Sequence, residues 1–451
     1  MTGDGLIGRL RRALTGRGAP ANRPPTRPET ELPEMLGALG AALLESSRAT
    51  SAVERILHEV STAYGRDDVL SFVLPTLVLV EDPSAGVHRT ELFPSTGAAL
   101  RLDQAGAVEQ LVERARDERM PPADVVRRLE RIRATPPRFN AFVMILGHAI
   151  VTVGFGLVLD PVALALPLYA VLGAIVGTVV VLTARFGQLS LVLPVLVPFA
   201  ITLGTGWLLA PLVGDDPIRL VTPALVSLLP GLTLTLAAVE LTSNQVVAGA
   251  SRMVYGFARL GLLVFGVFAA ITILGVHPEQ GSLPQLGVWA PWVGVVLTAV
   301  GYTLFSVAPR GAFPWIVVSL AVAYGAQLLG ALVVGPQLSG FVGAVVVIVV
   351  VGLLRRIPSA PPSAVMLMCA YWLLVPGAIG FIGLSQIAEG TGGASTLVVE
   401  TLVSLVAIAL GMVVGAGMTR EVDVVARGWR RVARAHVDGD GAEPGVEPPA
   451  R

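Results

Sequence analysis

The sequence predicts a mostly α-helical, polytopic membrane protein in which ten transmembrane helices form two inverted five-helix repeats after a small cytoplasmic α+β N-terminal domain. Three observations lead to this fold class. The chain has 451 residues, of which 53% are hydrophobic and only 14% are charged, whereas soluble domains carry about 25% charged residues. Most of the charge lies before residue 140 or after residue 418. Lastly, a Pro–Gly pair interrupts one apolar segment in each half of the membrane part.

The first 137 residues divide into a tail and a domain. Residues 1–30 are rich in Pro and Arg, which predicts a disordered basic tail. Residues 31–137 predict the cytoplasmic α+β domain, because helical and strand periodicities alternate there. The expected elements are one or two helices between 32 and 60, strands at 69–80 and 87–93 around a turn, and helices at 105–119 and 121–133.

The membrane part contains ten apolar segments, and a bilayer needs about 20 apolar residues for each helix. The first repeat, residues 138–276, has expected spans near 140–159, 161–183, 189–212, 219–241 and 254–276. The second repeat, residues 288–418, has expected spans near 288–308, 313–334, 338–354, 364–387 and 396–418. A cytoplasmic tail is expected at 419–451.

The arginines predict the orientation of these spans. With the N-terminal domain in the cytoplasm, the outer loops contain a single arginine, Arg219. The inner loops contain Arg185, Arg252, Arg310, Arg355, Arg356 and Arg420. This asymmetry follows the positive-inside rule and places both termini in the cytoplasm.

The two Pro–Gly pairs predict a substrate site. They lie in the fourth and ninth spans, and a break in a membrane helix leaves backbone groups that need partners. Each break creates half-helices whose free amides attract anions, while unwound carbonyls can hold a cation. Inverted repeats with such breaks are typical of secondary transporters. The candidate substrate-binding residues are Ser227, Pro230, Gly231, Thr233 and Thr235 at the first break, and Tyr371, Pro376, Gly377, Ser385 and Gln386 at the second.

The alternative is a pair of kinked helices without a ligand, in which Thr233 and Thr235 bond back to their own helix. Three ionisable residues in the spans are candidates for coupling transport to protons, namely His148, Glu240 and Glu400. A charge at mid-bilayer costs at least about 2.5–3.5 kcal/mol, so such residues usually have a function or a partner. A packing role for His148 and an interfacial position for Glu400 stay open.

Several motifs together resemble the threonine/serine exporter family of bacterial membrane proteins. They are Thr50-Ser-Ala-Val-Glu54 in the N-terminal domain, Pro230-Gly231 followed by Glu240 and by Gly249-Ala-Ser-Arg252, and Leu374-Val-Pro-Gly377. The resemblance implies export of L-threonine and L-serine from the cytoplasm, driven by protons, across the bacterial inner membrane. It implies no enzymatic activity and no cofactor, and it leaves homo-oligomerisation open.

Two other functions remain to be compared with this one. The first is a membrane-anchored hydrolase that uses Ser51, Glu54, His58 and Glu59, although the chain has no GxSxG or HExxH motif. The second is a channel, or an exporter of a different small solute. No metal site is expected, since the single cysteine, Cys369, lies within an apolar span. No nucleic-acid partner is expected either, because no basic stripe is interleaved with aromatic residues.

Overall fold

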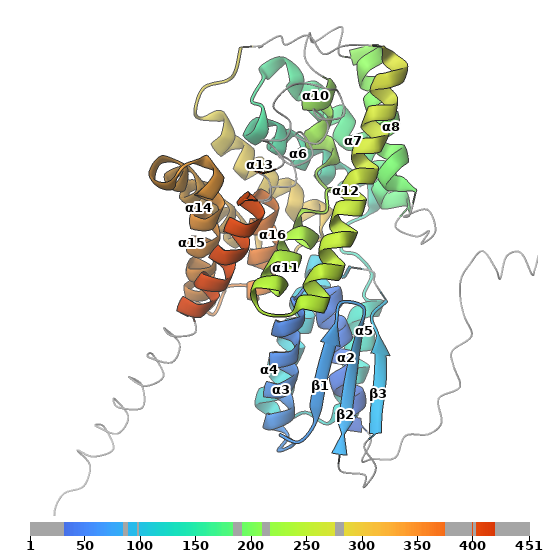
Figure 1. Ribbon diagram of the computed structural model, residues 1–451, viewed down its shortest axis with the longest axis vertical. Coiled ribbons are helices and arrows are strands. Elements are labelled where there is room, and N and C mark those ends of the chain that lie inside the picture. Colours follow the sequence, from blue (N-terminus) through green and yellow to red (C-terminus); the bar gives the residue numbers. More distant parts are fainter. Residues whose placement is uncertain are drawn as a thin grey trace, which may run out of the picture.

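The computed structural model describes residues 31–83, 89–96, 99–183, 192–209, 217–275, 284–374, 399 and 403–419. It shows an N-terminal α+β domain and a bundle of apolar helices, with α11 reaching down to the domain (Figure 1). The predicted tails lie outside the described residues, apart from Thr419 at the end of the last helix.

The N-terminal domain combines a three-stranded antiparallel sheet with four helices. The sheet has the order β1-β2-β3, formed by β1 Leu70–Leu74, β2 Leu77–Asp82 and β3 Arg89–Pro94. The helices are α2 Glu31–Glu45, α3 Thr50–Ala63, α4 Leu102–Glu118 and α5 Pro122–Ala134. Fully buried residues of α2, α3, β2 and α4, such as Leu36, Leu57, Val80 and Val108, pack in one core. This common core holds α3 and α4 in one body.

The prediction of a single strand over 69–80 is wrong. The structure has two strands there, joined at Pro75 and Thr76, with Leu74 paired opposite Leu77. Proline has no amide to donate to a strand ladder, so the chain turns at Pro75 instead of continuing. The apolar residues on both sides of the turn made the segment resemble one long strand.

The membrane part consists of apolar helices at the positions of the predicted spans. Five are long and apolar enough to cross a membrane: Ala141–Leu159 (α6), Ala163–Thr183 (α7 with a preceding 3-10 turn), Val246–Leu274 (α12), Phe313–Val334 (α14) and Pro336–Leu354 (a 3-10 turn with α15). Shorter apolar helices occupy the other predicted segments at Leu193–Leu208, Gly231–Thr242, Ala290–Phe305, Ser363–Leu374 and Val403–Thr419. The arrangement of ten spans as two inverted repeats stays a prediction.

The labelled elements of the bundle have the following bounds. They are α6 Ala141–Leu159, α7 Leu166–Thr183, α8 Leu193–Gly204 with a π-helical continuation to Leu209, α10 Pro217–Leu225, α11 Gly231–Thr242, α12 Val246–Leu274, α13 Ala290–Phe305, α14 Phe313–Val334, α15 Ser339–Leu354 and α16 Ser363–Leu374. The fifth span was expected to start at 254, but α12 begins at Val246. Arg252 lies within this helix, and its Nε atom is 3.1 Å from Oε2 of Glu240.

The first helices of the two halves, α6 and α13, pack against each other through glycines. A Cβ added at Gly294 would lie 2.6 Å from the carbonyl oxygen of Gly154, and one at Gly301 would lie 2.6 Å from that of Gly147. The pairing runs in opposite sequence directions, so the two helices are antiparallel. Small residues at such an interface let two membrane helices approach closely.

Candidate functional site

The fourth span is broken at the predicted position. Helix α10 ends at Leu225, the amide of Leu228 donates to the Leu225 carbonyl over 2.9 Å, and α11 begins only at Gly231. Pro230 stands between the two helices with φ −79° and ψ 32°, outside the regular helical geometry. The prediction of two half-helices separated by Pro230–Gly231 is therefore confirmed for this span.

The start of α11 presents uncapped backbone amides at the break. Leu234 donates to the carbonyl of Pro230 over 2.9 Å, so the amides of residues 231–233 precede the first bond of the helix. No side chain caps this end. Thr235 is buried, and its hydroxyl donates to the Gly231 carbonyl over 2.9 Å, whereas Thr233 is half-buried. The arrangement gives the positive end of a half-helix inside the bundle.

His148 and Ser227, which come from different spans, meet at this break. His148 lies halfway along α6, is fully buried, and has its Nδ1 atom 2.8 Å from the carbonyl oxygen of Gly173 on α7. Its Nε2 atom lies 2.8 Å from the hydroxyl of Ser227. A carbonyl oxygen only accepts, so its partners assign the proton to Nδ1, and the neutral ring accepts from Ser227 at Nε2.

Glycines bring α7 close to the face of α6 that carries His148. A Cβ added at Gly177 would lie 2.7 Å from the Cβ of His148, and one at Gly173 would lie 2.5 Å from the hydroxyl oxygen of Thr152. Phe305 of α13 covers the imidazole edge-on, with ring centroids 4.9 Å apart. These contacts fix the position of the imidazole. Of its two hydrogen-bond partners, only the Ser227 hydroxyl can reorient, because the other is a backbone carbonyl.

The segment with the second Pro–Gly pair is described only up to Leu374. Tyr371 and Trp372 lie on α16 and are half-buried, and the ring of Trp372 packs 4.9 Å from that of Tyr302. The other candidates of this half, namely Pro376, Gly377, Ser385, Gln386 and Glu400, lie outside the described residues. Their roles stay predictions.

Glu240 lies at the far end of α11, where the bundle meets the N-terminal domain. Its side chain is fully buried, and Oε1 accepts from the amide of Thr50, the first residue of α3, over 2.9 Å. Oε2 lies 3.1 Å from Nε of Arg252 on α12. Helix α3 has no side-chain cap of its own at Ala49. Glu240 therefore caps a helix of the other domain, and it lies about 13 Å along α11 from the break at ~1.5 Å per residue.

Glu109 makes the corresponding contact in the opposite direction. It belongs to α4 of the N-terminal domain, and it accepts from the hydroxyl of Ser363 over 2.8 Å and from the amide of Ala364 over 3.0 Å. These residues start α16, the helix that leads to the second Pro–Gly pair. Sequence reasoning missed Glu109, since an acidic residue on an amphipathic helix usually faces water. The start of its partner helix is marked in the sequence by Pro361-Pro362-Ser363.

Two of the residues considered for a hydrolase, Glu54 and Glu59, make structural contacts instead. Glu54 accepts from the amide of Val73 over 3.0 Å and from the side-chain amide of Gln245 over 2.9 Å. His58 is exposed, and Glu59 forms an ion pair with Arg55 at 3.3 Å. The side chains of Glu54 and Glu59 are thus engaged with partners other than His58.

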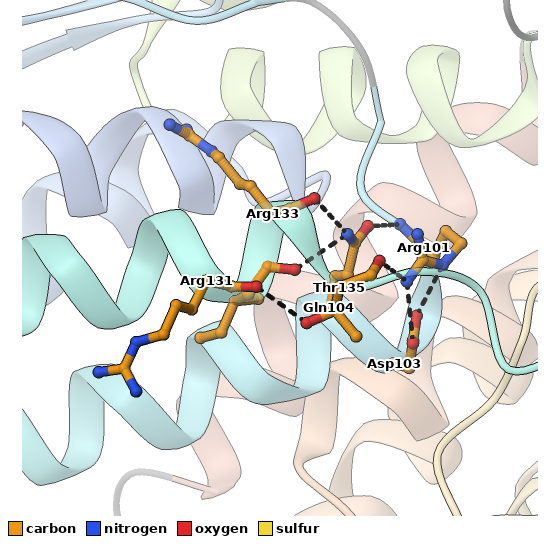
Figure 2. Close-up of polar contacts among 7 residues, drawn as sticks. Arg101, Asp103, Gln104, Arg131, Arg133 and Thr135 are labelled. Atoms are coloured by element: carbon orange, nitrogen blue, oxygen red, sulfur yellow. Dashed lines mark hydrogen bonds and ion pairs between the residues drawn. The ribbon is translucent and has the colours of Figure 1, made fainter.

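A polar network fixes the end of α5, from which the chain enters the membrane part (Figure 2). The side-chain amide of Gln104 donates to the carbonyls of Ile132 and Arg133, each over 3.1 Å. The guanidinium of Arg101 donates to the carbonyl of Thr135 over 2.9 Å. At the same end of α4, the amide of Leu102 donates to Ser306, just after α13, over 3.1 Å. These bonds tie the start of α4 both to α5 and to the bundle.

In the part of the chain that the structure describes, the fourth span of an apolar helix bundle is broken beside a buried polar pair, an arrangement typical of secondary transporters. The family model ThrE, described as "Putative threonine/serine exporter", matches residues 34–274, which is more than half of the chain. The protein therefore belongs to the ThrE family, which is a family of transporters rather than enzymes. Searches of curated proteins and of solved structures found no match.

Proposed function

We propose that this protein exports L-threonine and L-serine from the cytoplasm as a proton-coupled secondary transporter of the bacterial inner membrane. The family description supports the substrate class. The observation that carries the proposal is the break in the fourth span, where the uncapped start of α11 lies beside the His148–Ser227 pair.

The break suits a small zwitterion. The substrate carboxylate binds the amides of residues 231–233, because the start of a helix favours an anion. The ammonium group binds carbonyls that the break frees from helical bonding. The hydroxyl of threonine or serine then pairs with polar groups at the second break, for which Tyr371, Ser385 and Gln386 remain our candidates.

His148 is the group to which we assign the proton step. In the neutral ring, Nε2 accepts from Ser227. When Nε2 takes up a proton, it becomes a donor, and the Ser227 oxygen must accept from it. The Ser227 hydroxyl proton is then free to turn toward the substrate. Proton uptake at His148 thereby places a positive charge beside the binding site and also turns the Ser227 hydroxyl. The charge is the link that coupled transport needs, whereas the hydroxyl adjusts the affinity for the substrate.

The topology we propose follows the arginine distribution and the helix pattern. The ten apolar helices, with all predicted loop arginines except Arg219 on the inner side, support a topology in which both termini lie in the cytoplasm. The antiparallel packing of α6 and α13 supports two inverted five-helix repeats, residues 138–276 and 288–418.

The available energy is sufficient for such an exporter. One charge that moves through 100 mV supplies about 2.3 kcal/mol. At about 1.4 kcal/mol for each tenfold step, one proton supports a substrate gradient of tens-fold.

Efflux from proteoliposomes with an imposed pH gradient tests the proposal. We expect saturable efflux of L-threonine and L-serine that the gradient accelerates, and slower efflux of large or acidic amino acids measured in parallel. Efflux that neither saturates nor responds to the gradient would identify a channel and contradict the proposal. Saturable, gradient-driven efflux of a different solute alone would contradict the substrate class.

A further inference from the structure

Two glutamate side chains extend across the boundary between the bundle and the N-terminal domain, one from each side. Glu240 extends from α11 to the first amide of α3, and Glu109 extends from α4 to the first residues of α16. Both bind the start of a helix, where a negative charge is favoured and hydrogen bonds to it are charge-assisted. The Glu240 side chain is fully buried, and that of Glu109 is only 17% exposed. These are well-shielded contacts, not solvated surface pairs.

One arginine connects the two contacts. Arg48 lies two residues before Thr50, and its guanidinium is 2.9 Å from Oε2 of Glu109. Polar contacts, joined by the short backbone segment from Arg48 to Thr50, therefore lead from the fourth span, through the N-terminal domain, to the ninth span. We call these contacts the interdomain network. Its members are Arg252, Glu240, Thr50, Arg48, Glu109, Ser363 and Ala364.

The interdomain network contacts the bundle at two helices that adjoin the Pro–Gly pairs. Helix α11 follows the Pro230–Gly231 break, and α16 precedes the Pro376–Gly377 pair. Among the described residues, α11 and α16 are thus the membrane helices that both adjoin a Pro–Gly pair and carry or contact one of these carboxylates. Their partners, α3 and α4, share one core and cannot move separately without exposing it.

We propose that Glu109 and Glu240 are positioning residues through which the N-terminal domain couples α11 and α16, the helices next to the two Pro–Gly pairs. The domain holds α11 and α16 in one arrangement, and both contacts form or open together. Neither residue touches the substrate in this proposal. The role in transport rests on the proposed exporter function, whereas the coupling between the two contacts does not.

Hydrogen–deuterium exchange on the full-length protein in lipid nanodiscs tests the coupling directly. The amides of Thr50 and Ala364 are the reporters, because each donates to one of the carboxylates. Glu109→Gln keeps the side-chain volume and removes the charge. We expect it to accelerate exchange at Ala364 and also at Thr50, by about fivefold or more, the lower end of typical coupling between sites. Glu240→Gln must have the same effect on Ala364, since coupling is reciprocal.

The matched control is Glu118→Gln, an exposed glutamate at the end of the same helix α4. It should leave exchange at both reporters unchanged. Acceleration confined to the contact that carries the substitution would overturn the proposal. Where Glu109→Gln does not fold, Ser363→Ala removes a single donor to Glu109 and should give a smaller change of the same kind at Thr50.

Transport measurements separate this proposal from the proposed function. Glu109→Gln should lower the maximal rate of threonine efflux by tenfold or more, about 1.4 kcal/mol, with little change in KM. A purely structural loss would lower the amount of folded protein in proportion instead. If the wild-type protein exports no threonine but the exchange coupling is present, the exporter function fails and the coupling stands. Normal efflux and unchanged exchange at Thr50 in Glu109→Gln would refute the coupling alone.

Discussion

Polar clusters of different chemistry lie at the two ends of α11, although His148 at one end and Glu240 at the other are equally buried. At the break, His148 and Ser227 form a neutral pair whose hydrogen bond can reverse direction. At the other end, Glu240 lies between Arg252 and the amide of Thr50, so its carboxylate accepts one backbone hydrogen bond and faces a guanidinium group 3.1 Å away. The His148–Ser227 pair can exchange a proton when the serine hydroxyl turns. The contacts of Glu240 instead hold α11 against α3 and α12.

The difference shows that an ionisable residue in an apolar segment does not reveal its role by burial alone. The sequence makes Glu240 a candidate for coupling transport to protons, together with His148 and Glu400. The structure gives Glu240 partners on α3 and α12, and the coupling role that we propose belongs to His148. The predictions below separate the two clusters, beginning with the break itself.

The largest effect is expected from closing the break. The double variant Pro230→Ala, Gly231→Ala lets α10 and α11 join, because proline costs about 3 kcal/mol and glycine about 1 kcal/mol relative to alanine within a helix. Transport of threonine should stop while the protein stays folded and inserted, as shown by an unchanged or raised Tm. The control is Gly261→Ala on α12, because an added Cβ at Gly261 would meet open space. Retained transport in the double variant would reduce Pro230–Gly231 to a simple kink.

His148→Gln tests the neutral cluster. Glutamine can still donate to the Gly173 carbonyl, but it cannot take up a proton. We expect threonine efflux to fall by at least about tenfold, or 1.4 kcal/mol, and the remaining efflux to lose its dependence on the pH gradient. Initial rates at matched substrate concentration, with and without the gradient, measure this. A variant that still responds to the gradient like the wild type would exclude His148 from the proton step.

The sequence contains local signals for much of this structure and few for the contacts across the domain boundary. Apolar length predicted the helices, and Pro230–Gly231 predicted the break, because both properties belong to neighbouring residues. The local signal at Pro75 was present and was overlooked. In contrast, Glu240 meets a residue 190 positions away, and Glu109 meets one 254 positions away. Such partners depend on how the domains pack, which no periodicity encodes.

Substitution of Glu240 should lower the stability of the protein and leave the coupling of transport to protons in place. Glu240→Ala leaves Arg252 without its buried partner and α3 without its cap, and breaking a buried pair typically costs about 3–5 kcal/mol. Glu240→Gln keeps an acceptor for Thr50 and should cost less. Thermal unfolding in detergent gives the order of Tm as wild type, Glu240→Gln, Glu240→Ala. Both variants should keep the pH-gradient dependence of whatever efflux remains, and loss of that dependence would return Glu240 to the proton step.

We expect the smallest effect on efflux from substitution of Ser227. This variant tests whether the cluster at the break and the cluster around Glu240 have different roles. Ser227→Ala removes the donor to Nε2 of His148 and leaves a buried acceptor without its partner, which costs about 1–3 kcal/mol. His148 itself can still take up a proton, so efflux should remain responsive to the pH gradient while the KM for threonine rises several-fold. Ser251→Ala on α12, whose hydroxyl donates to the carbonyl of Ala248 in its own helix, is the matched control and should leave KM unchanged. If Ser227→Ala instead abolishes gradient dependence with KM intact, the serine hydroxyl belongs to the proton path rather than to the substrate site. The break would then be a proton route, with the amino acid bound elsewhere in the bundle.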